Sequence, residues 1–425
     1  MDYKEAVAYI HSTLWKGSRL GLTRMTELAQ KMGNPQSGMK FIHIAGTNGK
    51  GSTAAMLAAV FRESGYRTGL FTSPYITRFN ERIQIDSVFI SDGELASETE
   101  YVKRFAETME DSPTEFELIT AIALSFFRRK ECDIVILEVG LGGELDSTNV
   151  IDTPELAVIT AIGMDHTAQL GSSISEIAAA KAGIIKPIGD VIAYKNISEA
   201  DGVIASVCRD KGARLIWASS HDITPHGMRD GVQVFDWGDY KCLELSLLGS
   251  FQMRNCALVL GAVDILRERA WDISDTALRN AFKTVHWPGR FEVLQKKPFF
   301  LLDGGHNPQG VEAAAGALKD MLPGQKFVFI TGIMADKDLQ GLYAPLLPLA
   351  EAFVTVTPQN PRAMDAADLA LSLRNMGAIS HSAHSIESGI LMAKELCGGI
   401  SPICAIGSLY MAGAVRDIVL NKSDL

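Results

Sequence analysis

The stretch Ile44–Thr53 reads IAGTNGKGST, and it decides the fold of this 425-residue chain. A strand-like apolar run, KFIHIAG, leads into it, and a helical pattern from Lys50 to Ser64 follows it. A glycine-rich turn between a strand and a helix exposes backbone N–H groups and a helix N-terminus to a phosphate, while Lys50 can bridge the outer phosphates. The stretch therefore predicts a nucleotide-binding P-loop.

The loop departs from the strict GxxxxGK[ST] pattern. Ile44 stands where that pattern has its first glycine, and Gly51 follows Lys50 where a Ser or Thr is usual. The hydroxyl that normally binds Mg²⁺ is therefore missing, and another oxygen ligand is expected. The candidates are Ser52, Thr53 and Ser73.

Strand-like runs alternate with helical patterns along the chain. Runs such as DIVILEVG and ELAVITAIGMD are typical of strands buried on both faces of a parallel sheet. The turn-forming and charged stretch His286–Pro298 precedes a second strand–helix alternation. The sequence predicts an α/β protein with an N-terminal P-loop parallel-sheet ATPase domain, residues 1–294, and a smaller C-terminal Rossmann-like α/β domain, residues 295–425.

Three polar residues lie at or near the ends of apolar elements in the first domain. Glu138 ends the DIVILEVG strand, where a carboxylate is costly unless it is paired or binds metal, so a Mg²⁺ ligand is favoured. His166 follows another strand in AIGMDHTAQLG, and by residue type alone a hydrogen-bonded turn residue is favoured. Lys181 interrupts the apolar face of SISEIAAAKAGIIKP, which alone favours a snorkelling lysine.

The second domain supplies a further set of polar residues. The segment LLDGGHNP ends a strand with Asp303 and His306. Arg290 precedes it in the linker, where a guanidinium is expected to reach nucleotide phosphates. Together with the P-loop, these residues suit ATP-driven chemistry.

Composition excludes several classes of function. A net charge of −10 without any Lys/Arg-rich run argues against a nucleic-acid surface. Six cysteines without a CxxC pair favour a reducing compartment. Since the longest apolar runs, such as Ile119–Phe127, are too short to span a membrane and the N-terminus has no signal-like apolar region, a cytoplasmic location is expected.

Seven motifs carry a resemblance to a known family. In chain order they are GTNGKGST, TSPYITRFNERI, LEVGLGGELDSTN, GMDHTAQLG, PGRFE, DGGHNP and TGIMADKD. Together they resemble the folylpolyglutamate synthase/dihydrofolate synthase branch of the Mur ligase superfamily, and GSLYMAGAVR resembles that family's last strand and helix. One departure is Gly305, where the family usually has Ala; it removes only a methyl group.

The resemblance implies an ATP- and Mg²⁺-dependent ligase that adds L-glutamate to a folate through an acyl phosphate. The implied ATP site comprises Gly46, Thr47, Asn48, Gly49, Lys50, Gly51, Ser52, Asn255, Arg290 and Asp303. The implied Mg²⁺ ligands are Ser73, Glu138 and His166. The implied catalytic residues are Lys50, Lys181, which would be carbamylated, and His306, which would place the incoming glutamate.

Other functions fit part of this pattern. A Mur-type ligase acting on another acceptor would share most of the motifs, and dihydrofolate synthase activity stays open because the two reactions share ATP, metal and glutamate sites. A P-loop nucleotide-dependent regulator would hydrolyse nucleotide without an amino acid, but it leaves DGGHNP and GRFE unexplained. The expected partners are folate, L-glutamate and ATP, with no nucleic acid or membrane, and the chain is expected to be a monomer.

Overall fold

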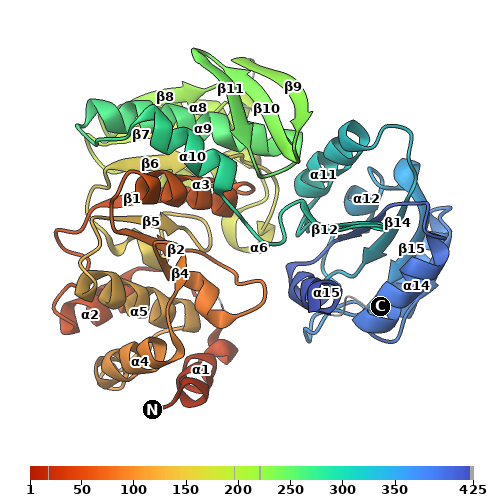
Figure 1. Cartoon of the computed structure of the whole chain (residues 1–425). Helices are drawn as coiled ribbons and strands as arrows, with labels where there is room; N and C mark the ends of the chain where they lie inside the picture. The colour runs from red at the N-terminus through yellow and green to blue at the C-terminus, as the bar shows by residue number, and fades with distance from the viewer. Residues whose placement is uncertain (18, 196, 220–221, 422–425) are drawn as a thin grey trace. The chain divides into compact units, whose positions relative to one another are not determined.

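The computed structural model describes residues 1–17, 19–195, 197–219 and 222–421, which form two compact units (Figure 1). The first comprises Met1–Gly227, Val234–Glu244 and Arg254–Val285, and the second comprises Met228–Gln233, Leu245–Met253 and His286–Leu425. Both are built from strands and helices, which confirms the predicted α/β class. The predicted division between residues 294 and 295 stays a prediction.

An eight-stranded sheet in the order β4-β3-β2-β5-β1-β6-β7-β8 forms the centre of the first unit. Its strands are β1 Phe41–Ala45, β2 Thr68–Phe71, β3 Ile83–Ile85, β4 Val88–Phe89, β5 Ile134–Glu138, β6 Leu156–Ile159, β7 Asp190–Tyr194 and β8 Arg214–Ala218. In this order, β2, β5, β1, β6 and β7 each pair in parallel with the next strand. Strands β3 and β4 pair antiparallel beside β2 and form one edge of the sheet. The carboxyl ends of β2, β5, β1 and β6 therefore meet at one edge of the sheet.

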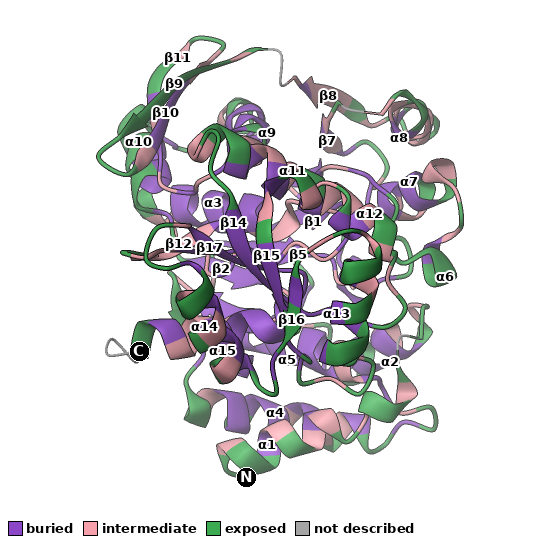
Figure 2. Ribbon diagram, turned by 90° about the vertical axis from the view of Figure 1, so that its right-hand side faces the viewer, coloured by how far each residue is buried: buried purple, intermediate pink, exposed green. Residues whose placement is uncertain are grey.

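Helices alternate with these strands. They are α1 Tyr3–His11, α2 Thr23–Lys31, α3 Lys50–Glu63, α4 Asp92–Ala106, α5 Glu115–Arg129, α6 Thr167–Leu170, α7 Ile174–Ala182, α8 Ser198–Asp210, α9 Ser250–Glu268 and α10 Asp275–Thr284. One apolar cluster joins α1, α2, α4 and α5 to Phe41, Phe71 and Val135 of the sheet. Every residue of β1 and β5 is buried (Figure 2), as expected for central strands covered on both faces.

A separate three-stranded sheet has its strands in the order β11-β10-β9, and its residues are divided between the two units. Its strands are β9 Ile223–Arg229, β10 Val232–Trp237 and β11 Tyr240–Leu245. Strand β9 is almost entirely exposed, so it lacks the apolar alternation that would predict a strand.

The second unit has a six-stranded sheet in the order β12-β13-β17-β14-β15-β16. Its strands are β12 Glu292–Lys296, β13 Phe299–Leu302, β14 Phe327–Thr331, β15 Ala350–Thr355, β16 Ser380–Ser382 and β17 Ile403–Ile406. Its helices are α11 Pro308–Met321, α12 Leu339–Tyr343, α13 Ala366–Asn375, α14 Ile386–Leu396 and α15 Leu409–Asn421. All neighbouring strands pair in parallel except β12 with β13, so this sheet too gathers strand ends at one edge.

Helix length and hydropathy also bear on membrane insertion. Within the described ranges, none of the helices combines the length and the apolar character needed to cross a bilayer.

Candidate active site

The turn between β1 and α3 is held in shape by the segment that follows β6. Thr47 Oγ1 donates to the Gly163 carbonyl and accepts from the Gly163 N–H, both at 3.0 Å, and Thr47 N donates to Ala161 O at 2.8 Å. Gly46 has φ +149°, and a Cβ there would overlap Thr160 Oγ1. The turn predicted to bind phosphate is therefore held in one shape, and it has room only for glycine at its first position.

A second glycine shapes the start of α3. Gly49 has φ +89° and precedes the first helical residue, Lys50. A Cβ at Gly49 would lie 2.5 Å from Asn255 Oδ1, so this α9 side chain lies directly against the turn. The contact brings Asn255, which only the resemblance suggested, to the predicted nucleotide loop.

Two lysines converge on one carbonyl of the turn. Lys50 Nζ donates to Gly46 O at 3.1 Å and to Thr47 O at 3.3 Å, and Lys181 Nζ donates to the same Gly46 O at 2.9 Å. Lys181 is 5% exposed, so it does not snorkel to solvent as its sequence context alone suggested. Both amines are therefore held at the turn.

The pKa of Lys181 follows from this placement. Burial, reinforced by the charge of Lys50, lowers the pKa from 10.5 to about 7, against the opposing charges of Asp165 and Asp146. A substantial share of the Lys181 amine is therefore uncharged at neutral pH. An uncharged amine is the form that acts as a nucleophile.

Ser73 and Glu138 meet at the ends of neighbouring strands. Glu138 ends β5 and is only 4% exposed, and Ser73 N donates to its Oε2 at 3.1 Å. A carboxylate and a hydroxyl are hard oxygen donors that suit Mg²⁺, which commonly binds through one or two carboxylates plus substrate phosphates. No group of three or more His, Cys, Asp or Glu side chains in the described ranges is arranged to hold a metal. The donors present thus fit a Mg²⁺ ion shared with a nucleotide.

His166 occupies an unusual backbone conformation. It is exposed, has φ 52° and ψ 38°, and precedes α6. Its N–H donates to Asp165 Oδ1 at 2.9 Å. A left-handed backbone at a residue other than glycine is uncommon and is enriched at functional sites. These observations fix the main chain of His166, and its role as a metal ligand stays a prediction.

The glycine-rich loop after β5 is organised by Asp146. This buried carboxylate accepts from Leu141 N at 2.8 Å and from Thr148 N at 3.0 Å, and burial raises its pKa. Glu144 N donates to Ala180 O at 2.9 Å, which fastens the loop to the helix that carries Lys181. The loop therefore links the end of the Glu138 strand to the Lys181 helix.

In the second unit, Asp303 follows β13 and is 4% exposed. Its Oδ2 accepts from Phe291 N at 2.9 Å and its Oδ1 from Gly305 N at 2.7 Å. Burial raises the pKa of this carboxyl, whereas the nearby Arg290 lowers it. Since a Cβ at Gly305 would lie 2.8 Å from Asp303 Oδ1, the glycine that departs from the family pattern gives this carboxylate space.

Two other predicted residues of this unit, Arg290 and His306, lie next to Gly304. His306 Nδ1 lies 3.0 Å from Gly304 O, and a Cβ at Gly304 would be 2.6 Å from Arg290 Nη1. Arg290, Asp303 and His306 thus gather at the carboxyl end of β13, and their roles toward nucleotide and glutamate stay predictions.

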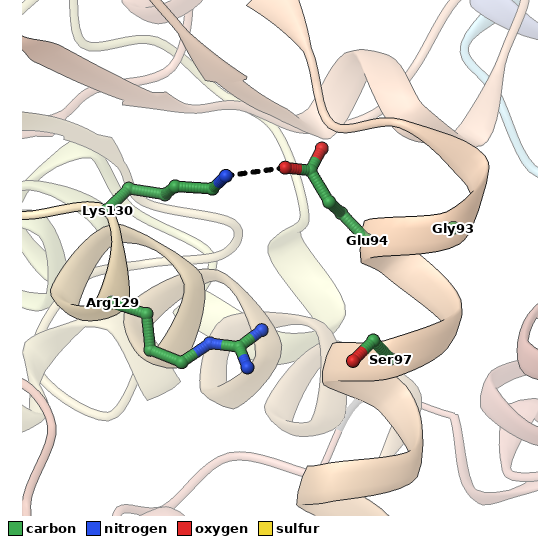
Figure 3. Close-up of a pocket in the computed structure, with 5 residues that line it drawn as sticks. All are labelled: Gly93, Glu94, Ser97, Arg129 and Lys130. Carbon is green, nitrogen blue, oxygen red and sulfur yellow. Dashed lines mark ion pairs between the residues drawn. The ribbon is translucent and has the colours of Figure 1, made fainter.

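An open hollow of about 420 Å³ lies elsewhere, between the beginning of α4 and the end of α5 (Figure 3). It is lined by Gly93, Glu94, Ser97, Arg129 and Lys130. Glu94 pairs with Lys130 at 2.7 Å, which lowers the Glu94 pKa to about 2, and Arg129 pairs with Glu98. None of the lining residues belongs to the predicted site, and the cations that line the hollow already have carboxylate partners.

The supporting residues Thr160, Ala161 and Gly163 were missed by sequence reasoning. They follow β6, the strand next to β1 in the sheet. They could have been found from the strand order, because the carboxyl ends of neighbouring parallel strands lie beside each other.

We expect Gly46→Ala to lower the thermal midpoint and to raise the KM for ATP. The added methyl group meets Thr160 in a well-packed turn, and such overpacking costs about 1–3 kcal/mol. The matched control is Gly202→Ala in α8, where a Cβ has open space and alanine should stabilise the helix by up to ~1 kcal/mol. Equal behaviour of the two variants would contradict the tight turn.

Comparison with known proteins agrees with this geometry. Residues 44–263 match the Mur ligase middle domain, and residues 289–401 match the Mur ligase glutamate ligase domain. The chain is 35% identical to the folylpolyglutamate synthase of Lacticaseibacillus casei, with 99% of each chain covered. It is 37% identical to the dihydrofolate synthase/folylpolyglutamate synthase of Bacillus subtilis, with 97% of this chain and 98% of the relative covered.

Solved structures extend the likeness to three dimensions. Mycobacterium tuberculosis folylpolyglutamate synthase complexed with ADP and AMPPCP superposes with a TM-score of 0.90 at 29% identity, covering 98% of this chain and 99% of the other. The agreement includes both Mur ligase domains. The chain therefore belongs to the folylpolyglutamate synthase/dihydrofolate synthase family of Mur ligases, and it is an ATP- and Mg²⁺-dependent ligase.

Proposed function

We propose that the protein joins L-glutamate to a folate by ATP-driven amide formation. The observation that carries the proposal is the agreement of nearly the whole chain with folylpolyglutamate synthases. The preformed phosphate turn with Lys50 and the buried carboxylate of Glu138 supply the parts that such chemistry needs. Domain boundaries at residues 1–294 and 295–425 belong to the same proposal.

The proposed reaction has two steps. A carboxylate oxygen of the folate attacks the γ-phosphorus of ATP, so that an O–P bond forms, the bond to ADP breaks and an acyl phosphate results. The glutamate amine then attacks the acyl carbon, phosphate leaves and the nitrogen loses a proton. This route is chosen because a free carboxylate is a poor acylating agent.

The residues of the turn serve the first step. We assign Gly46, Thr47, Asn48, Gly49, Gly51 and Ser52 to the cradle of the ATP phosphates, with Asn255 against it. Lys50 and Arg290 would offset charge that spreads over the transferred phosphoryl group. Ser73, Glu138 and His166 would hold Mg²⁺, which supplies further charge neutralisation when bound.

Lys181 has a separate proposed role. Its amine is buried and its pKa is about 7, so the neutral form can add to CO₂, giving a carbamate and releasing one proton. The reaction would replace a buried amine beside Lys50 with an anion able to bind metal. In the second unit, Asp303 would contact the nucleotide and His306 would place the incoming glutamate.

The acceptor, location and assembly complete the proposal. Dihydropteroate is proposed as a second acceptor because the Bacillus subtilis relative is named for both activities. All six cysteines are free, which supports a reducing, cytoplasmic location. We also propose a monomer.

The test is glutamate-dependent ADP release with tetrahydrofolate, methylenetetrahydrofolate or dihydropteroate, followed by mass spectrometry of each acceptor. One added glutamyl mass on a folate is expected, and the same addition to dihydropteroate would establish the second activity. If every acceptor returns unchanged, the folate assignment fails and a Mur-type ligase with another acceptor takes its place. Nucleotide hydrolysis independent of glutamate would instead favour a regulator.

A further inference from the structure

Two residues to which the proposed function assigns no role, Arg416 and Glu292, meet in the second unit. Arg416, from GSLYMAGAVR on α15, donates through Nε to both carboxylate oxygens of Glu292, each at 3.1 Å. Glu292, the last residue of PGRFE, also accepts from Gly289 N at 2.8 Å. One carboxylate therefore connects the last helix to the turn that carries Arg290.

The same turn is fixed on its other sides. Gly289 has φ +67°, and its carbonyl accepts from Gly304 N at 2.8 Å. Phe291 N donates to Asp303 Oδ2 at 2.9 Å. The residues on both sides of Arg290 are thus hydrogen-bonded, so its backbone direction is set by this frame.

The pair between Arg416 and Glu292 is well placed to contribute to that frame. The Glu292 side chain is 11% exposed and the Arg416 side chain 23% exposed, so solvent screens them less than a surface pair. His286 Nε2 lies 3.6 Å from the same carboxylate, but its side chain is 63% exposed. Loss of Arg416 would therefore leave a largely buried carboxylate without its main charge partner, which is costly.

We propose that Arg416 and Glu292 are positioning residues, which hold the Gly289 turn so that Arg290 meets the nucleotide. The inference rests on the proposed function, in which Arg290 contacts ATP. A small displacement of a group that contacts the reacting phosphates can cost up to about a hundredfold in rate. Arg416→Ala should therefore lower kcat/KM for ATP by about tenfold or more.

The test is a double-mutant comparison of the full-length protein, with kcat/KM for ATP and the thermal midpoint measured for every variant. Arg290→Ala and Arg416→Ala should each lower kcat/KM. Arg416→Ala added to Arg290→Ala should cause no further loss, because its effect passes through Arg290. Guanidinium ion added to Arg416→Ala should restore part of the activity, but none in the double variant.

A matched control separates positioning from general stability. Arg374 of α13 is another hydrogen-bonded arginine of the second unit, and it donates to Ser380 O at 2.9 Å. Arg374→Ala should leave kcat/KM unchanged. If Arg416→Ala fails to fold, Glu292→Gln provides the second arm. It keeps an oxygen for Gly289 N, removes the charge paired with Arg416 and should show the same lack of additivity with Arg290→Ala.

Each outcome has a distinct meaning. If the double variant loses kcat/KM by the product of the two single-variant factors, the positioning role is overturned. The nucleotide role of Arg290 would then remain intact. Unchanged kcat/KM in folded Arg290→Ala would overturn the nucleotide role itself and, with it, this inference. In either case, glutamate addition by the wild-type protein reports separately on the proposed function.

Discussion

A Lys50→Ala protein is expected to lose about a hundredfold or more in kcat for glutamate-dependent ADP release, as seen when a preorganised charge contact is removed. Lys50 Nζ donates to the carbonyls of Gly46 and Thr47 at the N-terminus of α3, where we propose that the ATP phosphates bind. The turn itself should persist, since Thr47 is held independently by Gly163 and Ala161. The loss should therefore appear in catalysis and leave the thermal midpoint nearly unchanged.

A lysine from the same unit provides the control for this substitution. Lys211→Ala also removes an amine that donates to a backbone carbonyl, that of Ile185, at a position outside the phosphate turn. Its turnover should match that of the wild type. Near-normal turnover by a folded Lys50→Ala protein would remove Lys50 from the phosphate site.

Lys181→Met should lower kcat by about a hundredfold, because it removes both the buried amine and the anion that CO₂ would create from it. Wild-type activity should fall in CO₂-free buffer and return with bicarbonate, whereas the variant should respond to neither. A ¹³C spectrum with labelled bicarbonate should show a carbamate signal in the wild type only. Partial rescue of Lys181→Ala by acetate or propionate would identify the missing group as an anion.

The same lysine makes stability depend on pH in CO₂-free buffer. Its pKa is about 7 in the folded protein against 10.5 for the exposed group, so between these values the unfolded chain holds a proton that the folded chain lacks. Unfolding then takes up a proton, and the contribution of Lys181 to the free energy of unfolding rises as pH rises from about 7 towards 10.5. Lys181→Met should flatten this rise. An identical pH profile for variant and wild type would contradict the lowered pKa.

Local sequence patterns were sufficient for much of the fold. The apolar runs at Phe41–Ala45 and Ile134–Glu138 are fully buried strands, and the helix after the phosphate turn begins at Lys50 as predicted. Strand β9 could not be predicted, because its side chains are mostly exposed and carry no apolar period. Its place is set by pairing with β10, which is a property of the folded sheet.

The site was predictable to the extent that its residues stand at strand ends. Gly46 and Glu138 stand at strand ends and Lys50 begins the next helix, all by chain order alone. The burial of Lys181 instead depends on the tertiary contact that brings its amine to Gly46 O. Arg416 and Glu292 are 124 positions apart in the chain, and neither motif indicates by its own sequence that it contacts the other. Long-range contacts of this kind become visible only in the folded chain.

The central claim is that ATP activates a folate carboxylate, and isotope transfer tests it most directly. The folate acceptor would be labelled with ¹⁸O in its terminal carboxylate, and the phosphate released during glutamate addition would be examined by mass spectrometry. Transfer through an acyl phosphate predicts one ¹⁸O atom in each phosphate formed. Phosphate that carries no ¹⁸O, released while glutamate is still added to the folate, would contradict the account.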